Sequence, residues 1–155
     1  MKLLLVFRLD NDLYGLEGGQ VDRIVPQVRL RPVPHAPEYV RGMFNLHGTI
    51  IPVIDLSRLV AGRDASSVMS TRVVVVRFPC HDGITRYLGL LAEKILEIRS
   101  VDLSLVEEPV IRTGGAPYLG ELVKDESGLI QVIELPRLLP EAMQDTLFAA
   151  GGDGG

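Results

Sequence analysis

The hydrophobic positions of this chain fall in short runs that are separated by polar turns. Branched and aromatic apolar residues fill each run, and Gly, Pro, Asp or Asn bounds it. Such runs are typical of β-strands, because they are too short for buried helices and rich in side chains that pack on a pleated surface. Turn signals recur every 8–12 residues or so, which predicts small barrels or a sandwich. The predicted strands are residues 3–9, 13–17, 20–25, 49–54, 72–78, 86–92, 94–99, 118–124 and 129–134.

Turn residues predict how the runs connect. Gly18-Gly19 separates the strands at 13–17 and 20–25 and favours a hairpin between them. The helical elements are brief: one turn at residues 37–41, and one turn through Leu59 that the carboxylate of Asp55 can cap. Residues 140–149 carry one apolar stripe, which predicts a short C-terminal helix.

The chain repeats part of its own pattern. IPVIDLSRL at 51–59 is identical at six of nine positions to IQVIELPRL at 130–138, and Asp55 matches Glu134. Residues 15–24 and 89–98 also match, at an offset of 74 residues. The period is too long for a solenoid and predicts two similar subdomains, with residues 61–70 as a linker. Pro52 has no counterpart in the second copy, which predicts an edge or a bulge there.

Composition narrows the function. The 155 residues are 46% hydrophobic and carry a formal charge of −4, which argues against nucleic-acid binding and against attraction to an anionic membrane. The apolar run near the N-terminus is too short for a secretory signal, and no run reaches the length of a membrane helix. We therefore expect a cytoplasmic protein. The single cysteine excludes a disulfide framework within the chain.

The candidate chemistry is sparse. His35, His47 and His81 lie in separate predicted turns without a metal-binding spacing, so neither a metal site nor a catalytic triad is predicted. Asp55 and Glu134 could form a carboxylate pair, but their repeated context favours two structural caps. No phosphate-binding glycine loop is present, and no cofactor is expected. A protein without reactive groups works by contact.

The motifs taken together resemble the CheW family of chemotaxis coupling proteins over residues 1–145. They are V-x-x-I at 21–24, V-P-x-x-P-x-Y-V-x-G at 33–42, N-L-x-G-x-I-I-P-V-I-D-L at 45–56, G-L-L-A-E-K-I-L-E-I at 89–98 and L-I-Q-V-I-E-L-P-R-L-L at 129–139.

The resemblance implies an all-β fold of two intertwined SH3-like five-stranded barrels, with short helical turns and a short C-terminal helix. It places the first subdomain at about 13–66, the second at about 1–12 plus 67–145, and a flexible tail at 146–155. It also implies a non-enzymatic adaptor that couples chemoreceptor tips to the regulatory domain of a CheA-type histidine kinase. Such adaptors associate in rings and are recruited to membrane-associated receptor arrays without inserting into the membrane.

The resemblance also implies where partners bind. Receptor contacts are expected near Val21, Arg23, Gly42, Asn45 and His47, with Gly42 allowing a helix to come close. Val74 and Val76 would either form an apolar wall for the receptor or belong to the core. Leu16 and Gly18 are the expected kinase contacts.

Two residues depart from the family pattern. His47 stands where Arg is usual, and Arg23 stands where Glu is usual, so an Arg–His pair would replace a Glu–Arg pair. The departures favour a specialised pathway such as surface sensing, pili or biofilm signalling. The alternative is a scaffold or localisation protein of the same fold outside receptor arrays.

Overall fold

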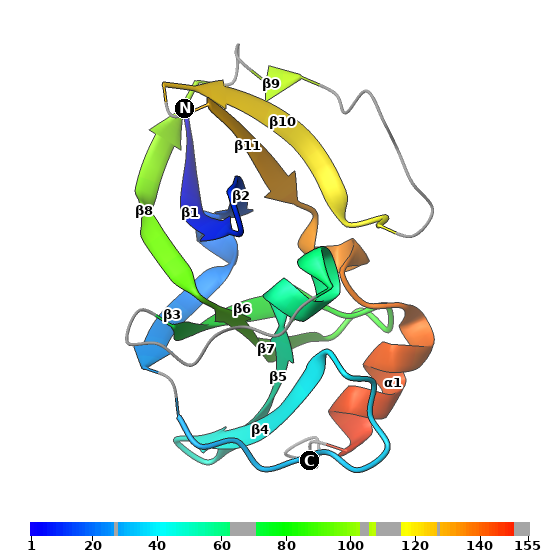
Figure 1. Cartoon of the computed structure of the whole chain (residues 1–155). Helices are drawn as coiled ribbons and strands as arrows, with labels where there is room; N and C mark the ends of the chain where they lie inside the picture. The colour runs from blue at the N-terminus through cyan, green and yellow to red at the C-terminus, as the bar shows by residue number, and fades with distance from the viewer. Residues whose placement is uncertain (27, 63–70, 103–105, 108–115, 127, 151–155) are drawn as a thin grey trace.

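The computed structural model describes residues 1–26, 28–62, 71–102, 106–107, 116–126 and 128–150. Most of the predicted linker at 61–70 lies outside these residues. Within them the chain forms two curved sheets, one above the other in the view of Figure 1, and short helical elements pack beside them. The all-β expectation and the pair of subdomains are confirmed.

Each sheet is named here by its number of described strands. The six-stranded sheet has the order β8-β1-β2-β11-β10-β9, and the five-stranded sheet has the order β3-β6-β7-β5-β4. The strands of the six-stranded sheet are β1 (Lys2–Leu9), β2 (Asp12–Glu17), β8 (Lys94–Val101), β9 (Val106–Glu107), β10 (Leu119–Asp125) and β11 (Gly128–Ile133). Those of the five-stranded sheet are β3 (Val21–Pro26), β4 (Val40–Leu46), β5 (Thr49–Asp55), β6 (Arg72–Pro79) and β7 (Thr85–Ala92).

The predicted hairpin between residues 13–17 and 20–25 is wrong. β2 pairs with β1 and β11 in the six-stranded sheet, whereas β3 pairs with β6 in the five-stranded sheet. The glycines between them form a short 3-10 helix, Gly18–Gln20, which carries the chain from one sheet to the other. A glycine pair marks a change of direction, but it does not specify which strands pair.

The two halves of the chain exchange strands. β2 pairs in parallel with β11, and β7 pairs in parallel with β5, so each sheet joins strands from both halves. The strands β6 and β7 therefore lie with β3, β4 and β5, although the sequence assigned residues after 67 to the other subdomain. Likewise, both β1 and β2 belong to the six-stranded sheet, not β1 alone. The repeat seen in the sequence corresponds to this exchange, because each sheet contains one parallel pair formed by a strand from each half.

Strands β1 and β6 are buried on both faces, because each separates two cores. On β1, Leu4 and Val6 face the interior of the six-stranded sheet, and Leu5 and Phe7 face a core shared by the two sheets. β6 repeats this arrangement with alternate valines. Burial on both faces explains why these strands are continuous apolar runs instead of alternating ones.

Pro52 lies inside a sheet. β5 pairs with β4 on one side and with β7 on the other, so the prediction of an edge strand is wrong. The parallel pairing with β7 begins at Val53, one residue after the proline. The irregularity in the β4–β5 pairing lies at Val40–Gly42 and not opposite Pro52. Pro52, which has no N–H to donate, therefore lies just outside the part of β5 that pairs with β7.

The short helical elements follow the predictions in part. A turn begins at Pro37, whose carbonyl accepts from the Val40 N–H at 3.0 Å, and a π-helical turn η2 (Ser57–Ala61) follows β5. The 3-10 helix η4 (Leu135–Arg137) stands at the equivalent place after β11, and α1 (Glu141–Ala150) packs beside β6 and β7 (Figure 1).

The tail predicted from residue 146 is wrong for residues 146–150, because Leu147 and Phe148 of α1 are buried in the shared core. No helix among the described residues is long and apolar enough to cross a membrane.

Candidate partner-binding surface

The turn between β4 and β5 holds His47 at the surface. Leu46 and Thr49 close a two-residue turn in which His47 and Gly48 have φ angles of 52° and 92°. Two positive φ values match the turn geometry that suits the right-handed twist of a hairpin. The side-chain oxygen of Asn45 accepts from the Gly48 N–H at 2.8 Å and fixes this shape. The imidazole of His47 is exposed, so it is available to a partner.

Gly42 has a different role from the predicted one. Its φ is +140°, and an added Cβ would lie 2.6 Å from the Arg31 carbonyl oxygen and 2.9 Å from the Leu30 Cβ. The segment before β4 therefore occupies the space that the sequence interpretation reserved for a receptor helix. Arg31 and Met43 exchange two backbone hydrogen bonds of 2.8 Å across this contact. Gly42 allows the segment before β4 to pack directly against β4, and its substitution would disturb the fold itself.

Arg23 is engaged within its own strand. Its Nε donates to Asp22 Oδ2 at 2.7 Å, and Arg77 of β6 donates to Asp22 Oδ1 at 2.9 Å. The hydrogen bond from Arg23, together with the charges of Arg23 and Arg77, lowers the pKa of Asp22. β3 and β4 are the two edges of the five-stranded sheet, so the structure pairs Arg23 with Asp22 and not with His47.

Three of the predicted contact residues are core residues. Val74, Val76 and Leu16 have no exposed surface and belong to the core shared by the sheets. They face inward because β6 and β2 are covered on both sides, so the core alternative holds for Val74 and Val76, and the expected kinase contact at Leu16 is wrong. Val21 is half-buried opposite Val76, and Gly18 is half-buried against Leu3.

A groove that the sequence interpretation missed lies beside Asn45. It has a volume of about 540 Å³ and is lined by the segment before β4 and by β4 itself. Leu30, Met43 and Phe44 supply apolar surface, while Arg29 and Arg31 are exposed beside it. We call this surface the β4 groove; its lining residues are Val28, Arg29, Leu30, Arg31, Pro32, Met43, Phe44 and Asn45.

A signal for the groove was present in the sequence. Val28-Arg29-Leu30-Arg31 alternates apolar and basic residues, the pattern of a segment with one covered and one exposed face. No described residue forms an ion pair with Arg29 or Arg31, so both guanidinium groups can meet a carboxylate.

The candidate carboxylate pair is two separate structural groups. Asp55 is fully buried, and its oxygens accept from Arg41 Nη1 at 3.1 Å and from the Arg58 N–H at 3.2 Å. The predicted cap at Asp55 is thus confirmed. Glu134 makes no such cap and forms an ion pair with Arg137 instead. No group of three or more His, Cys, Asp or Glu side chains within the described ranges is placed to hold a metal ion.

The family model for the CheW-like domain matches residues 3–143. The chain belongs to the CheW-like domain family. Its curated relatives include the chemotaxis protein CheW of Treponema pallidum, which is 31% identical over 87% of this chain and 80% of the relative. The chemotaxis protein CheW of Klebsiella aerogenes is 30% identical over 76% and 72% of the two chains. The crystal structure of the scaffolding protein TtCheW from Thermoanaerobacter tengcongensis superposes with a TM-score of 0.78 at 28% identity and covers 90% of this chain and 88% of that one.

The family match decides between catalysis and contact. CheW-like proteins are adaptors and scaffolds of chemotaxis, not enzymes. The histidine of the NLHG turn is accordingly a surface residue of an adaptor, held outward by the turn and not placed beside a nucleophile.

Proposed function

We propose that this chain couples chemoreceptors to a CheA-type histidine kinase by binding both. The observation that supports the proposal is the match to a chemotaxis scaffold family over residues 3–143, with the same two-sheet architecture as a solved scaffolding protein. Coupling requires that the contacts differ between receptor states, because a partner that binds both states equally shifts nothing. Recruitment to receptor arrays at the membrane and self-association into rings belong to the same proposal.

The β4 groove and the adjoining turn are the receptor-facing surface in this proposal. Apolar side chains at the groove can take the apolar face of a receptor helix, and Arg29 and Arg31 can pair with its acidic residues. Asn45 and His47 extend this surface along the β4–β5 turn. Val21 and Arg23 lie on β3, at the opposite edge of the sheet, and would contact a second part of the partner.

The kinase contact is proposed at the turn between the sheets. Leu16 is buried, so the accessible part of the predicted contact is Gly18 and its exposed neighbour Gly19. An added Cβ at Gly19 would meet nothing within 4 Å, so this backbone is open to a partner. The departures at Arg23 and His47 support a specialised chemosensory pathway, since both lie on surface that a partner can reach.

A ternary reconstitution tests the function. Kinase autophosphorylation is measured with receptor, with and without this protein, and we expect the receptor to control the kinase only when the protein is present. Arg31→Glu should weaken the response about tenfold, because a reversed charge repels an acidic helix. His47→Asn keeps a residue that tolerates positive φ, so it removes the imidazole without opening the turn.

The control is Lys94→Glu, which reverses an exposed charge on β8 of the other sheet and should respond as the wild type does. Receptor control without this protein would overturn the coupling function. Binding of one partner without kinase control would instead favour the scaffold alternative. A wild-type response of Arg31→Glu would overturn the assignment of the β4 groove as the receptor surface, but not the coupling function.

Pull-downs against every receptor and kinase of the host test the specialised pathway, and binding of the main chemotaxis kinase alone would contradict it.

A further inference from the structure

The turn between β6 and β7 holds the C-terminal helix through a histidine placed between two carboxylates. His81 Nε2 lies 2.8 Å from Asp145 Oδ1, and His81 Nδ1 lies 3.5 Å from Glu141 Oε1. Asp145 and Glu141 are four residues apart, so they share one face of α1. Both nitrogens of one imidazole therefore face acidic oxygens of the same helix.

The protonation state of such an imidazole decides whether both contacts are favourable. An imidazolium carries an N–H on each nitrogen and can donate to both carboxylates. A neutral imidazole carries one N–H, so its other nitrogen would present a lone pair to a negative oxygen. The geometry suits the cation.

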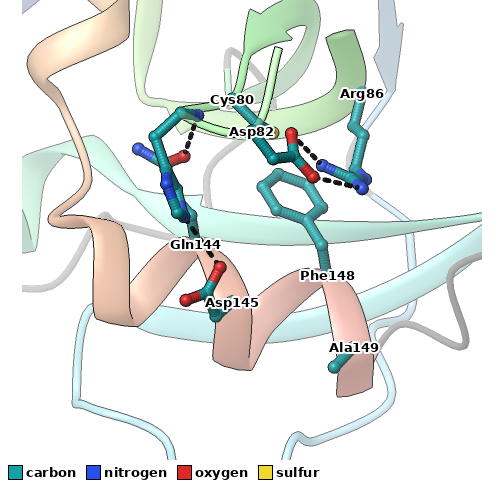
Figure 2. A pocket seen from close by; sticks show the side chains of 8 residues that line it. Cys80, Asp82, Arg86, Gln144, Asp145, Phe148 and Ala149 are labelled. Atoms are coloured by element: carbon teal, nitrogen blue, oxygen red, sulfur yellow. Dashed lines mark hydrogen bonds and ion pairs between the residues drawn. The ribbon is translucent and has the colours of Figure 1, made fainter. Parts of the chain in front are cut away.

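Other contacts around the same joint do not depend on this proton. The buried Gln144 accepts from the His81 backbone N–H at 2.8 Å and donates to the Leu139 carbonyl at 2.9 Å. Arg86 forms a two-bond ion pair with Asp82 and lies 5.6 Å above the centre of the Phe148 ring. Figure 2 shows these side chains converging from the turn and from α1. Because these contacts do not involve the imidazole, we expect them to keep the helix near its place when the His81 contacts weaken.

The hollow at this joint, about 210 Å³, is not a ligand site by its chemistry. Its polar side chains are engaged with one another: His81 with Asp145, Asp82 with Arg86, and Gln144 with the backbone. The remaining lining comes from Cys80, Phe148 and Ala149. The joint is built to dock a helix.

We propose that His81 is a proton-dependent clamp that holds α1 on the β6–β7 turn, so that the helix docks more tightly when the imidazole is protonated. The groups that face this imidazole are Asp145 and Glu141 from α1 and Asp82 from its own turn, with Arg86 of β7 held on Asp82. All three carboxylates favour the cation.

The direction of the pH dependence follows from these contacts. The hydrogen bond that His81 donates to Asp145 raises the pKa of His81 above its ordinary value of 6.5 and outweighs desolvation, with help from the charges of Asp145, Glu141 and Asp82. A group whose pKa is higher in the docked state stabilises docking fully below the undocked pKa. The contribution is then lost as the pH rises through the docked pKa. Docking should therefore weaken from about pH 6 to about pH 8.

Amide hydrogen exchange of the full chain tests the clamp. After correction for intrinsic exchange, we expect protection of α1 to fall several-fold between about pH 6 and about pH 8, since each unit of pKa difference is worth tenfold in docking. Amides of β1 and β6 should not change in parallel. His81→Gln should lower the protection of α1 at pH 6 and remove its pH response.

Two further variants separate the clamp from general destabilisation. Asp145→Asn changes an exposed carboxylate that α1 presents to His81, so the chain should still fold, and the pKa of His81 measured by NMR should fall. His47→Asn removes an exposed histidine of the β4–β5 turn and should leave the response of α1 as in the wild type.

The thiol of Cys80 gives an independent measurement. Cys80 is the single cysteine of the sequence, it is buried, and it lines the hollow beneath α1. Its labelling rate in the wild type is divided by that of His81→Gln at the same pH, so that pH effects common to the two proteins cancel. The ratio should be below one near pH 6 and approach one near pH 8.

The clamp would be overturned if His81→Gln kept the wild-type pH response. It would also be overturned if α1 and the strands lost protection together. These measurements use no receptor or kinase, so they fail or succeed independently of the proposed coupling function.

Discussion

At the scale of the residue, two carboxylates at equivalent positions show how a repeated motif can diverge. Asp55 and Glu134 occupy equivalent positions, and each donates its backbone N–H to a tyrosine carbonyl at 2.7 Å, from Asp55 to Tyr39 and from Glu134 to Tyr118. The backbone role is shared, but the side chains differ. Asp55 is buried and caps the following turn, whereas Glu134 is partly exposed and pairs with Arg137.

Alanine at these two positions makes a matched comparison. We expect Asp55→Ala to lower the free energy of unfolding by about 2–4 kcal/mol, because it removes a buried carboxylate that accepts from the Arg58 N–H and from Arg41. Glu134→Ala should cost less than about 1 kcal/mol, because a partly exposed ion pair contributes little. Denaturant unfolding measures both, and equal losses would contradict the assignment of the buried cap.

The residue scale also shows where sequence reasoning ended. The NLHG turn and the cap at Asp55 were predictable, because each depends on a few neighbouring residues. The inward direction of Val74 and the contact of Gly42 with Arg31 were not predictable, because they depend on strands and segments distant along the chain. The His81–Asp145 contact spans 64 residues and gave no local signal.

At the scale of the element, the two parallel strand pairs are the joints of the fold. β2 with β11 and β5 with β7 are short parallel pairings, and each contains a glycine at the repeated position, Gly15 and Gly89. Close packing at these positions leaves little room for a side chain. An added Cβ at Gly89 would lie 2.8 Å from Val53 Cγ2, and one at Gly15 would lie 3.2 Å from Ile130 Cγ2.

The two joints should therefore tolerate alanine differently. We expect Gly89→Ala to cost about 1–3 kcal/mol, because it overpacks against stiff β-branched side chains of a buried strand. Gly15→Ala should change stability by less than about 1 kcal/mol, since its neighbours need to move by only a few tenths of an ångström. Thermal and denaturant unfolding of the pair give the comparison. A larger loss at Gly15 would contradict the packing at the β5–β7 joint.

At the scale of the whole molecule, the exchange of strands makes two sheets into one cooperative unit. Each sheet contains strands from both halves of the chain, and the shared core takes side chains from both sheets. Neither half can complete a sheet alone. The repeat in the sequence thus resembles two domains, whereas the packing unites them.

Dividing the chain between Gly62 and Thr71 tests this unity. The fragment 1–62 keeps β1 to β5 but loses β8, β11, β6 and β7, which pair with β1, β2, β3 and β5 respectively, so we expect it to be unfolded alone by circular dichroism. Mixing it with 71–155 should restore strand structure and a cooperative transition. A fragment that folded alone would show that the halves are independent.

The sequence by itself determined the described strands except β4 and β9, together with the repeat, the NLHG turn and the cap at Asp55, because those features follow from the spacing of apolar residues and from short-range hydrogen bonds. It also indicated the family, through motifs spread over most of the chain. The tertiary structure alone decided which strands pair, which valines are buried and which surface is hollow. Strand pairing depends on contacts between distant segments, and alternation within one run cannot show that both faces are covered. For that reason the β4 groove and the His81 clamp emerged from the fold.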